Sequence, residues 1–356
     1  MVAVLLVGGE GRRLRPLTDT RPKPMMALVD RPFIQHQLDH LRRFGIQDVV
    51  FSCGYLPDQV VDYFGDGSAL GMRLTYVVDP FPLGTAGAIK NAEPHLGSGD
   101  FLVLNGDILT DLDLAELQAA HGISGASGTI ALTPVEDPSA FGLVRLHPDR
   151  SVDAFLEKPA REDLLPGEPF NINAGTYLMS RDVLAEIPDG VMCSIERDIF
   201  PKIAAAGRLF GHPNNAYWRD IGTHRSYLDA HLDVLTGRVR TESPTGVRYL
   251  GVGAIVAPGA EVSGGSSIGA GASVGPGACV TGSVIGDGVK VARGARVDGA
   301  IVGAGARIDD GANIGPGVVV GDGARVGGGS SLVGTVLVDT HAHLQPGTQR
   351  DGSQPA

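Results

Sequence analysis

The residues that decide the fold are Gly8-Gly9-Glu10-Gly11-Arg12-Arg13-Leu14-Arg15-Pro16-Leu17-Thr18, followed by Arg21-Pro22-Lys23-Pro24. They come directly after the apolar run Val2-Ala3-Val4-Leu5-Leu6-Val7, which is typical of a buried parallel strand. Glycines after such a strand let backbone N–H groups approach an anion closely, because no Cβ stands in the way. Arginines and a lysine follow at once, so the stretch indicates a site for a nucleoside triphosphate.

Two common phosphate-binding motifs do not fit this stretch. No Gly-Lys-Ser/Thr follows, as a Walker loop requires, and no third glycine stands at the dinucleotide-binding spacing. The stretch instead resembles that of the sugar-1-phosphate nucleotidyltransferases, or NDP-sugar pyrophosphorylases, whose motif is Gly-Gly-x-Gly-Thr/Ala-Arg-Leu followed by Pro-Lys-Pro. The mannose-1-phosphate guanylyltransferases are the most similar members. Arg12 stands where the family usually has Thr or Ala, which matters little if that position offers a backbone N–H.

Composition limits the classes of partner. The 356 residues predict two domains, and a hydrophobic share of 43% suffices for a sizeable core. The formal net charge of −11 disfavours binding to nucleic acid or to an acidic membrane surface, so local cations must hold anionic substrates. The three cysteines form neither a disulfide framework nor a zinc spacing, which fits a reducing cytoplasm. The N-terminal apolar run is too short for a signal peptide or a membrane span.

Helical and strand patterns alternate after the glycine stretch. Helical spacing over 33–44 and 58–64 alternates with apolar runs at 48–52 and 74–78. This order predicts an α/β fold, a doubly wound mixed sheet, in a nucleotidyltransferase domain over residues 1–240. Ligands of such sheets lie beyond the carboxyl ends of the strands, where the glycine stretch also lies.

The nucleotide-binding residues follow from the resemblance. In the family, the segment matching Pro82-Leu83-Gly84-Thr85-Ala86-Gly87-Ala88 lines the base pocket. The residues implied to bind the nucleotide are Gly8, Gly9, Gly11, Arg12, Asp79, Gly84 and Thr85. A carboxylate only accepts hydrogen bonds, and guanine offers two adjacent donors, so Asp79 predicts a preference for GTP. The alternative is that Asp79 is a solvated loop residue before a proline.

Two aspartates are candidate metal ligands. The apolar strand 101–105 leads to Asp107, whose position alone is equally compatible with a metal ligand and with a helix cap. The resemblance implies that Asp107 is the first Mg²⁺ ligand. It also implies that Asp220, in the motif Trp218-Arg219-Asp220-Ile221-Gly222, is the second ligand. Arg13 and Lys23 would then stabilise the departing pyrophosphate.

The resemblance also implies a sugar-phosphate side. Strand patterns at 129–133, 142–146 and 152–156 precede Glu157-Lys158-Pro159. In the family this motif places Lys158 on the sugar phosphate and Glu157 on sugar hydroxyl groups. Segments around Gly142 and Asn173 also match, and they would offer a backbone group and a side chain to the sugar ring.

From Leu250 onward, apolar residues recur every six positions. The period shows two five-residue slips, at 280–285 and 297–302. It predicts a parallel β-helix of hexapeptide repeats over 246–338, with about five coils of ~18 residues, left-handed by family expectation, and a flexible tail over 346–356. No histidine occurs from 250 to 340, which disfavours acyl transfer. We therefore expect a structural module through which the chain forms a homo-oligomer.

The pattern as a whole predicts transfer of a nucleotidyl group from an NTP to a sugar 1-phosphate, with GMP from GTP and mannose 1-phosphate as the favoured pair. Several alternatives stay open. One is a glucose-1-phosphate uridylyl- or thymidylyltransferase, and another is a guanylyltransferase for a cyclitol 1-phosphate such as valienol 1-phosphate. A regulatory paralogue that binds nucleotide-sugars without turnover would lack Arg13, Lys23 or a metal aspartate, but all are present.

Overall fold

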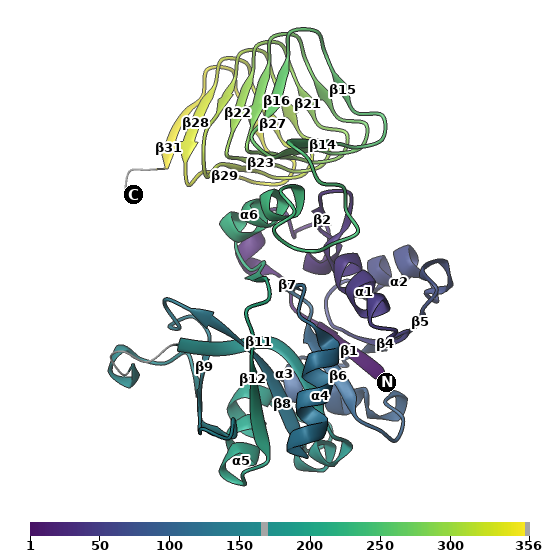
Figure 1. Cartoon of the computed structure of the whole chain (residues 1–356). Helices are drawn as coiled ribbons and strands as arrows, with labels where there is room; N and C mark the ends of the chain where they lie inside the picture. The colour runs from purple at the N-terminus through teal and green to yellow at the C-terminus, as the bar shows by residue number, and fades with distance from the viewer. Residues whose placement is uncertain (165–169, 353–356) are drawn as a thin grey trace. The chain divides into compact units, whose positions relative to one another are not determined.

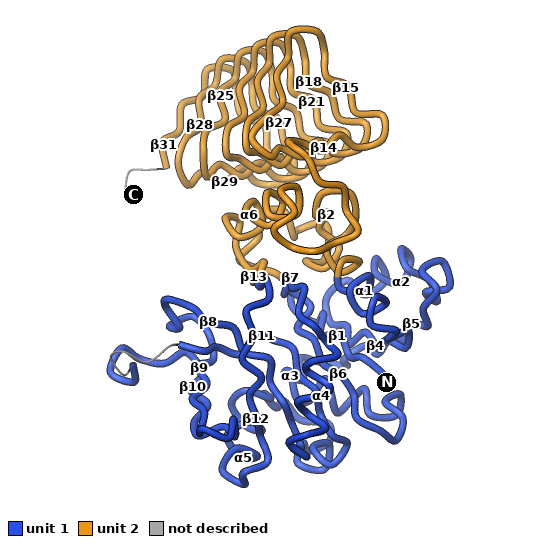
Figure 2. The backbone as a smooth tube through the Cα atoms, viewed as in Figure 1, with its two compact units in different colours: residues 1–9, 37–218 blue, residues 10–36, 219–356 orange. Residues whose placement is uncertain are grey.

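The computed structural model describes residues 1–164 and 170–352 and divides the chain into two compact units (Figure 2). Unit 1 comprises residues 1–9 and 37–218, and unit 2 comprises residues 10–36 and 219–356. The glycine stretch is divided between them after Gly9. The predicted domain over 1–240 stays a prediction; by compactness, residues 10–36 and 219–240 group with the repeats.

Unit 1 is built on one sheet. Its strands are β1 (Val2–Val7), β4 (Asp48–Cys53), β5 (Arg73–Val78), β6 (Phe101–Asn105), β8 (Gly128–Val135), β9 (Gly142–Leu146), β10 (Val152–Glu157), β11 (Phe170–Met179) and β12 (Leu209–Pro213). Within the described residues the order is β10-β9-β11-β6-β1-β4-β5, and β8 pairs with both β11 and β12 (Figure 1). Strands β6, β1, β4 and β5 run parallel, whereas β11 is antiparallel to β6, which confirms the mixed sheet.

Helices connect these strands. They are α1 (Phe33–Arg43), which begins in unit 2, α2 (Pro57–Phe64), α3 (Gly84–Asn91), α4 (Leu114–Ser124) and α5 (Phe200–Ala205), and the short strand β7 (Ile108–Thr110) precedes α4. The start of α4 shows why the sequence folds this way locally. Asp113 caps it by accepting hydrogen bonds from the N–H groups of Ala115 and Glu116 at 2.9 and 3.1 Å. The helix ends at Ser124, and Gly125 caps it with a φ of 61°, a conformation that suits glycine.

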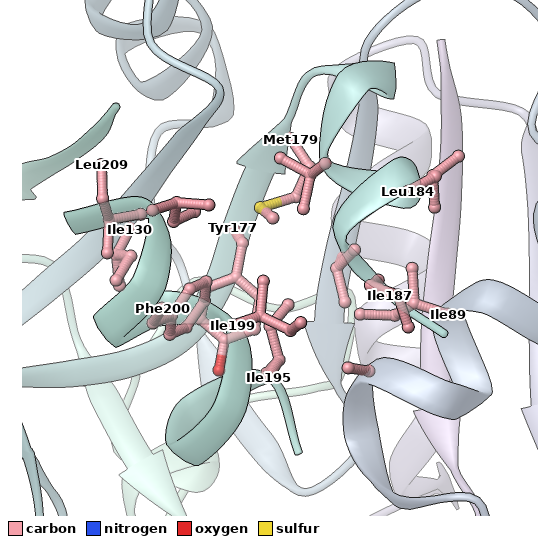
Figure 3. Close-up of a cluster of buried hydrophobic side chains, with 14 of the residues drawn as sticks. Ile89, Ile130, Tyr177, Met179, Leu184, Ile187, Ile195, Ile199, Phe200 and Leu209 are labelled. Carbon is pink, nitrogen blue, oxygen red and sulfur yellow. The ribbon is translucent and has the colours of Figure 1, made fainter. Parts of the chain in front are cut away.

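The core of unit 1 packs against β11. Tyr177 is fully buried there, and its ring meets that of Phe200 edge-on at 5.0 Å between centroids (Figure 3). Ile130, Ile195 and Leu209 complete the surroundings of these rings. The Tyr177 hydroxyl accepts a hydrogen bond from Asn173 Nδ2 at 2.8 Å. The core therefore fixes a residue that the sequence assigns to the sugar side.

Unit 2 begins with elements that precede the repeats. They are β2 (Ala27–Leu28), β3 (Arg31–Pro32) and α6 (His224–Leu235), and β13 (Trp218–Asp220) crosses the boundary between the units. A capping box starts α6. Thr223 Oγ1 accepts from Ser226 N at 3.1 Å, and Ser226 Oγ accepts from Thr223 N at 3.0 Å. The capping box thus places the first helical residue at His224.

The repeats form three parallel sheets, which are the three faces of a β-helix. The first holds β14 (Arg248–Leu250), β17 (Ser266–Ile268), β20 (Val284–Ile285), β23 (Ile301–Val302), β26 (Val319–Val320) and β29 (Leu337–Val338). The second holds β15 (Ile255–Val256), β18 (Ser273–Val274), β21 (Lys290–Val291), β24 (Arg307–Ile308), β27 (Arg325–Val326) and β30 (His343–Leu344). The third holds β16 (Glu261–Ser263), β19 (Cys279–Thr281), β22 (Arg296–Asp298), β25 (Asn313–Ile314), β28 (Ser331–Gly334) and β31 (Gln349–Gly352).

The six-residue period predicts the stacking of this β-helix. Val274 pairs with Val291, which pairs with Ile308, and each of these side chains is buried inside the coils. The slips shorten two successive coils to 17 residues, from Ser267 to Val284 and from Val284 to Ile301, whereas the coils before and after them have 18. These features confirm the left-handed hexapeptide β-helix.

The β-helix is longer than predicted. Each face holds six strands in the described part of the chain, and the last strand, β31, pairs with β28 from Gln349 to Gly352. The flexible tail predicted from residue 346 is therefore wrong as far as Gly352, and residues 353–356 lie outside the described residues. The reason is physical: a polar segment can extend a parallel ladder through backbone hydrogen bonds alone.

No helix within residues 1–164 and 170–352 combines the length and the apolar character that crossing a membrane needs.

Candidate functional site

The part of the glycine stretch in unit 2 is a compact loop. Gly11 has a φ of 63°, a conformation that suits glycine, and a Cβ there would lie 3.0 Å from Lys23 Cβ. The Gly11 carbonyl accepts a hydrogen bond from Thr18 Oγ1 at 2.9 Å. A side chain at position 11 would therefore push Lys23 out of place, which explains the glycine.

Three predicted catalytic residues come together in unit 2. Lys23 Nζ lies 4.0 Å from Asp220 Oδ1, and the Lys23 side chain is only 11% exposed. A Cβ on Gly222 would lie 2.6 Å from Arg13 Nη2 and 2.8 Å from Asp220 Oδ1. The guanidinium of Arg13 and the carboxylate of Asp220 therefore flank Gly222. Two cations and one carboxylate thus meet at the end of the glycine stretch.

Arg12 points to a different partner. Its Nε donates to Glu10 Oε2 at 2.7 Å, and both side chains are exposed. An exposed pair of this kind contributes little to stability. The predicted nucleotide contact of Arg12 stays a prediction.

In unit 1, Gly8 and Gly9 follow β1, and Gly8 lies beside Asp79. The Cα and N of Gly54 pack against Gly8, and a Cβ on Gly8 would lie 4.0 Å from Asp79 Oδ2. Asp79 Oδ1 accepts a hydrogen bond from Asn91 Nδ2 at 2.9 Å. Burial raises the pKa of the Asp79 carboxyl, and the Asn91 hydrogen bond opposes this rise. Asp79 is therefore a partly buried, oriented acceptor rather than a fully solvated loop residue.

The first turn of α3 forms hydrogen bonds with other residues of unit 1. Gly84 has a φ of 70°. The N–H groups of Ala86 and Gly87 donate to the Cys193 carbonyl at 3.0 and 3.2 Å. Thr85 Oγ1 donates to Glu196 Oε2 at 2.7 Å and accepts from Ile195 N at 2.9 Å. The Thr85 hydroxyl thus orients a carboxylate within the protein.

The sugar-side residues lie on three adjoining strands. Gly142 on β9 pairs in register with Glu157 on β10, and a Cβ on Gly142 would lie 3.1 Å from Glu157 Oε2. Asn173 on β11 is fixed, because Nδ2 donates to Tyr177 and Oδ1 accepts from Gly175 N at 2.8 Å. These three predicted residues are therefore side by side in unit 1.

Lys158 follows β10 in an unusual conformation. It is exposed and has a φ of 52°, in the left-handed region that lysine rarely adopts. Its N–H donates to the Phe141 carbonyl at 2.9 Å, which holds the turn. Strained backbone of this kind costs on the order of 1–3 kcal/mol and clusters at functional sites.

One acidic residue on this side was not predicted. Glu196 receives hydrogen bonds from Thr85 and from Ser194 Oγ, the latter at 2.8 Å. Burial, followed by the negative charge of Glu196, raises the pKa of Glu157. No periodicity or spacing in the sequence links residue 196 to residues 85 and 157, so only the fold reveals the pair of carboxyls.

The two predicted metal ligands belong to different units. Asp107 follows β6 in unit 1, and Asp220 ends β13 in unit 2. Among the described residues, no group of three or more His, Cys, Asp or Glu side chains could hold a metal ion. Mg²⁺ is commonly held by one or two carboxylates together with substrate phosphates, so these residues fit an ion that arrives with a nucleotide. Their sharing of one ion stays a prediction.

Comparison with known families assigns both parts of the chain. Residues 2–237 match the nucleotidyl transferase family, and residues 241–319 match the GlmU-like C-terminal hexapeptide family. The chain belongs to the nucleotidyl transferase family. Members of this family generally use a divalent metal ion.

Individual relatives of this nucleotidyl transferase agree with that assignment. A mannose-1-phosphate guanylyltransferase from Mycobacterium tuberculosis is 40% identical over 262 residues, which are 72% of each chain. HddC from Yersinia pseudotuberculosis, solved in complex with GMP-PN, is 28% identical with a TM-score of 0.56, over 64% of this chain and 97% of HddC. A Bacillus anthracis structure, assigned provisionally as a glucose-1-phosphate thymidylyltransferase, is 25% identical with a TM-score of 0.59, over 68% of this chain and 98% of that chain.

Proposed function

We propose that this nucleotidyl transferase moves GMP from GTP to mannose 1-phosphate and releases pyrophosphate. The observation that carries the proposal is the cluster of Arg13, Lys23 and Asp220 at the glycine stretch. It occurs in a chain 40% identical to a mannose-1-phosphate guanylyltransferase. Cations placed in this way serve a reaction that brings two phosphate groups together.

In the proposed reaction, an oxygen of mannose 1-phosphate attacks the α-phosphorus of GTP. The new P–O bond forms while the bond from the α-phosphorus to the bridging oxygen breaks, and the electron pair leaves with pyrophosphate. The attacking oxygen is already ionised at neutral pH, so no general base is needed. The protein's task is to orient two anions and to neutralise their charge.

Roles follow from position. Arg13 and Lys23 would stabilise the charge on pyrophosphate, and Lys158 would hold the phosphate of the sugar. Glu157, Asn173 and the Gly142 backbone would contact the sugar ring. In support, Gly142 on β9 pairs with Glu157 on β10, and β9 also pairs with β11, the strand of Asn173.

Asp107 and Asp220 would hold Mg²⁺. When bound, the ion would neutralise phosphate charge and fix the geometry of the transferred group. The carboxylate of Asp220 lies beside Lys23, so it also keeps that ammonium group oriented in the loop.

Asp79 is the proposed selector for guanine, with Gly8, Gly9, Gly11, Gly84 and Thr85 around the nucleotide. The support is that Asp79 is half-buried, held by Asn91 and placed beside Gly8. Its carboxylate would accept hydrogen bonds from N1–H and the 2-amino group of guanine, whereas a pyrimidine would present acceptors to it.

The experiment is a pyrophosphate-release matrix. The purified protein is incubated with Mg²⁺ and each of ATP, CTP, GTP, UTP and dTTP, against mannose, glucose and valienol 1-phosphates. We expect the highest kcat/KM for GTP with mannose 1-phosphate. A maximum at UTP or dTTP with glucose 1-phosphate, or at GTP with valienol 1-phosphate, would assign one of the alternative substrates. No release with any pair would make the chain a non-catalytic binding protein.

We also propose that the chain forms a homo-oligomer through the β-helix. Exposed apolar side chains gather near its first coil, where Val247, Val252 and Ile255 are 80%, 88% and 64% exposed. Three short edge strands, β14, β15 and β16, end the sheets there. Sedimentation of the wild type and of a Val252→Lys/Ile255→Lys variant tests this surface, and an unchanged sedimentation coefficient would contradict it.

A further inference from the structure

Segment 16–21 connects the two cations of the proposed pyrophosphate site. It follows Arg13 and precedes Lys23, and unit 2 contains all of these residues. Two residues from late coils of the β-helix, Asp322 and Thr340, contact it at its two ends. These partners are far apart in the sequence: Arg21 and Asp322 are separated by 301 positions.

At the end near Lys23, Asp322 makes two short hydrogen bonds. Its Oδ2 accepts from Thr20 Oγ1 at 2.6 Å and from Arg21 Nη2 at 2.7 Å. The Asp322 side chain is only 11% exposed, so solvent screens this ion pair weakly. Charge-assisted hydrogen bonds of this length are the strong ones in proteins.

At the other end, Thr340 contacts the start of the segment. Thr340 Oγ1 donates to the Pro16 carbonyl at 3.3 Å. Thr340 lies one coil beyond Asp322, because β26 and β29, which precede the two residues, are adjacent strands of one face. Two successive coils thus hold the two ends of one segment.

Asp322 divides its carboxylate between two tasks. Oδ1 accepts from Ala304 N at 2.8 Å, which closes a corner of the β-helix, while Oδ2 reaches the segment. Asp287 stands in an equivalent Ile/Val-Gly-Asp-Gly unit and closes its own corner by accepting from Ala270 N at 2.8 Å. Among the described residues, that is the one hydrogen bond found for the Asp287 side chain. Asp287 is therefore a matched control within the same chain.

We propose that Asp322 is a positioning residue that makes the β-helix part of the catalytic machinery. By anchoring Thr20 and Arg21, it sets where the neighbouring Lys23 stands and how far the loop can move. The inference rests on the proposed function, since that assigns Lys23 to pyrophosphate. It extends the expectation of a purely structural repeat domain, because the repeats also hold a segment of the site.

The test compares Asp322→Asn with Asp287→Asn. In each variant the amide oxygen can still accept the corner N–H, so the β-helix keeps its hydrogen bond. At position 322 the amide nitrogen would face Thr20 and Arg21, and it cannot accept from the guanidinium. The first variant therefore loses the charge-assisted bond from Arg21, whereas the second keeps the one side-chain hydrogen bond of residue 287.

Two readouts are measured on the full-length protein. Steady-state kinetics with GTP should show kcat reduced by about 10- to 100-fold in Asp322→Asn, with the KM for mannose 1-phosphate within about twofold of wild type. Hydrogen exchange should be faster over residues 10–26 in this variant. Asp287→Asn should match the wild type in both, and equal melting temperatures of the two variants exclude a general loss of structure.

Arg21→Gln removes the same contact from the segment side, and it decides the matter if Asp322→Asn does not fold. The double variant should lose no more activity than either single variant, because both remove one interaction. Kinetics and exchange in Asp322→Asn or Arg21→Gln equal to those of Asp287→Asn would overturn the proposal. If the wild type does not make GDP-mannose, the proposed function fails, and the exchange data still decide the positioning role.

Discussion

The two lysines of the proposed site differ in their surroundings. Lys23 is nearly buried and lies 4.0 Å from the Asp220 carboxylate, whereas Lys158 is exposed at a turn with a φ of 52°. A nearly buried ammonium group in a low-dielectric site interacts more strongly with a phosphate than an exposed one does. We infer that Lys23 acts mainly on the transition state and Lys158 mainly on substrate binding.

This difference gives the first prediction. Lys23→Ala should lower kcat with GTP by about 100-fold, and Lys158→Ala should chiefly raise the KM for mannose 1-phosphate by about 10-fold. Initial-rate kinetics with each substrate varied in turn measure both effects. Lys290→Ala, an exposed lysine on β21, serves as the control. The same change in both parameters for both variants would contradict the division of roles.

The second prediction concerns Asp107. Asp107→Asn keeps the shape of the side chain but removes the charge that a divalent ion needs, so kcat should fall by about 100-fold or more. The melting temperature should stay near that of the wild type, because Asp107 follows the strand rather than lying in it. Asp100→Asn, at the other end of β6 and exposed, is the control. Turnover near wild type with saturating Mg²⁺ would remove Asp107 from the metal site.

The third prediction concerns Asp79: replacing it should lower the activity with GTP but raise the melting temperature. Asp79→Gln should reduce kcat/KM for GTP by about 10- to 100-fold and narrow its margin over UTP and dTTP. Unchanged nucleotide preference in the substrate matrix would leave Asp79 without a selective role.

The stability arm uses Asp79→Asn. Burial raises the pKa of Asp79 in the folded chain above its unfolded value, so the unfolded state loses its proton first and stability falls as pH rises through that interval. The variant should therefore melt at a higher temperature than the wild type at pH 7. The gain should vanish below about pH 4, where both states are protonated. Asp62→Asn, an exposed position on α2, should show no such gain.

At the scale of elements, helix α6 connects strand β2 to the first face of the β-helix through one buried histidine. His231 Nε2 donates to the Ala27 carbonyl at 3.2 Å, and Nδ1 accepts from Ser267 Oγ at 2.9 Å. Nδ1 also lies 3.3 Å from Val29 N, which donates to it. These contacts require the neutral ring, and burial lowers the pKa of His231 to about 3.

The fourth prediction follows from this shift. His231 gains a proton near pH 6.5 in the unfolded chain but only near pH 3 in the folded chain. Its contribution to the free energy of unfolding is therefore complete above pH 6.5 and is lost as the pH falls. The wild type should lose about 1.4 kcal/mol of unfolding free energy per pH unit through this residue. His231→Gln, which keeps a donor and an acceptor, should show a shallower dependence in urea titrations from pH 7 to 4. A control, His95→Gln, changes an exposed residue. Equal slopes in all three proteins would contradict the prediction.

Elements differ in how far the sequence predicts them. Inward residues such as Val274 and Ile308 are predictable because burial repeats with the coil, and the period reports burial directly. Strand β31 is not, because Gln349 and Arg350 carry no apolar signal and join the sheet through their backbone. Likewise nothing in the sequence of α6 predicts its contacts with Ala27.

For the whole molecule, local motifs identify the candidate residues but not their grouping. The glycine stretch predicts that Arg13 and Lys23 lie near each other, since a short loop connects them. Nothing local predicts that the charge of Glu196 acts on Glu157, or that Asp322 bonds to Thr20 and Arg21, because both interactions join distant parts of the chain. The division of the chain after Gly9 could not be predicted for the same reason.

The stacking of the coils has a consequence for how the protein tolerates changes in length. Ile285 pairs in register with Val302, so deleting residues 285–301 should close the β-helix without a gap and draw Asp322 back by one rung, about 4.8 Å. That displacement is longer than a hydrogen bond, so Asp322 would no longer reach Thr20 and Arg21. The variant should fold but show the slow turnover expected for Asp322→Asn. Inserting a second copy of residues 268–284 in the gap should restore kcat, whereas wild-type kinetics after the deletion alone would show that rung count is irrelevant. The number of coils that precede Asp322 would then determine the catalytic rate.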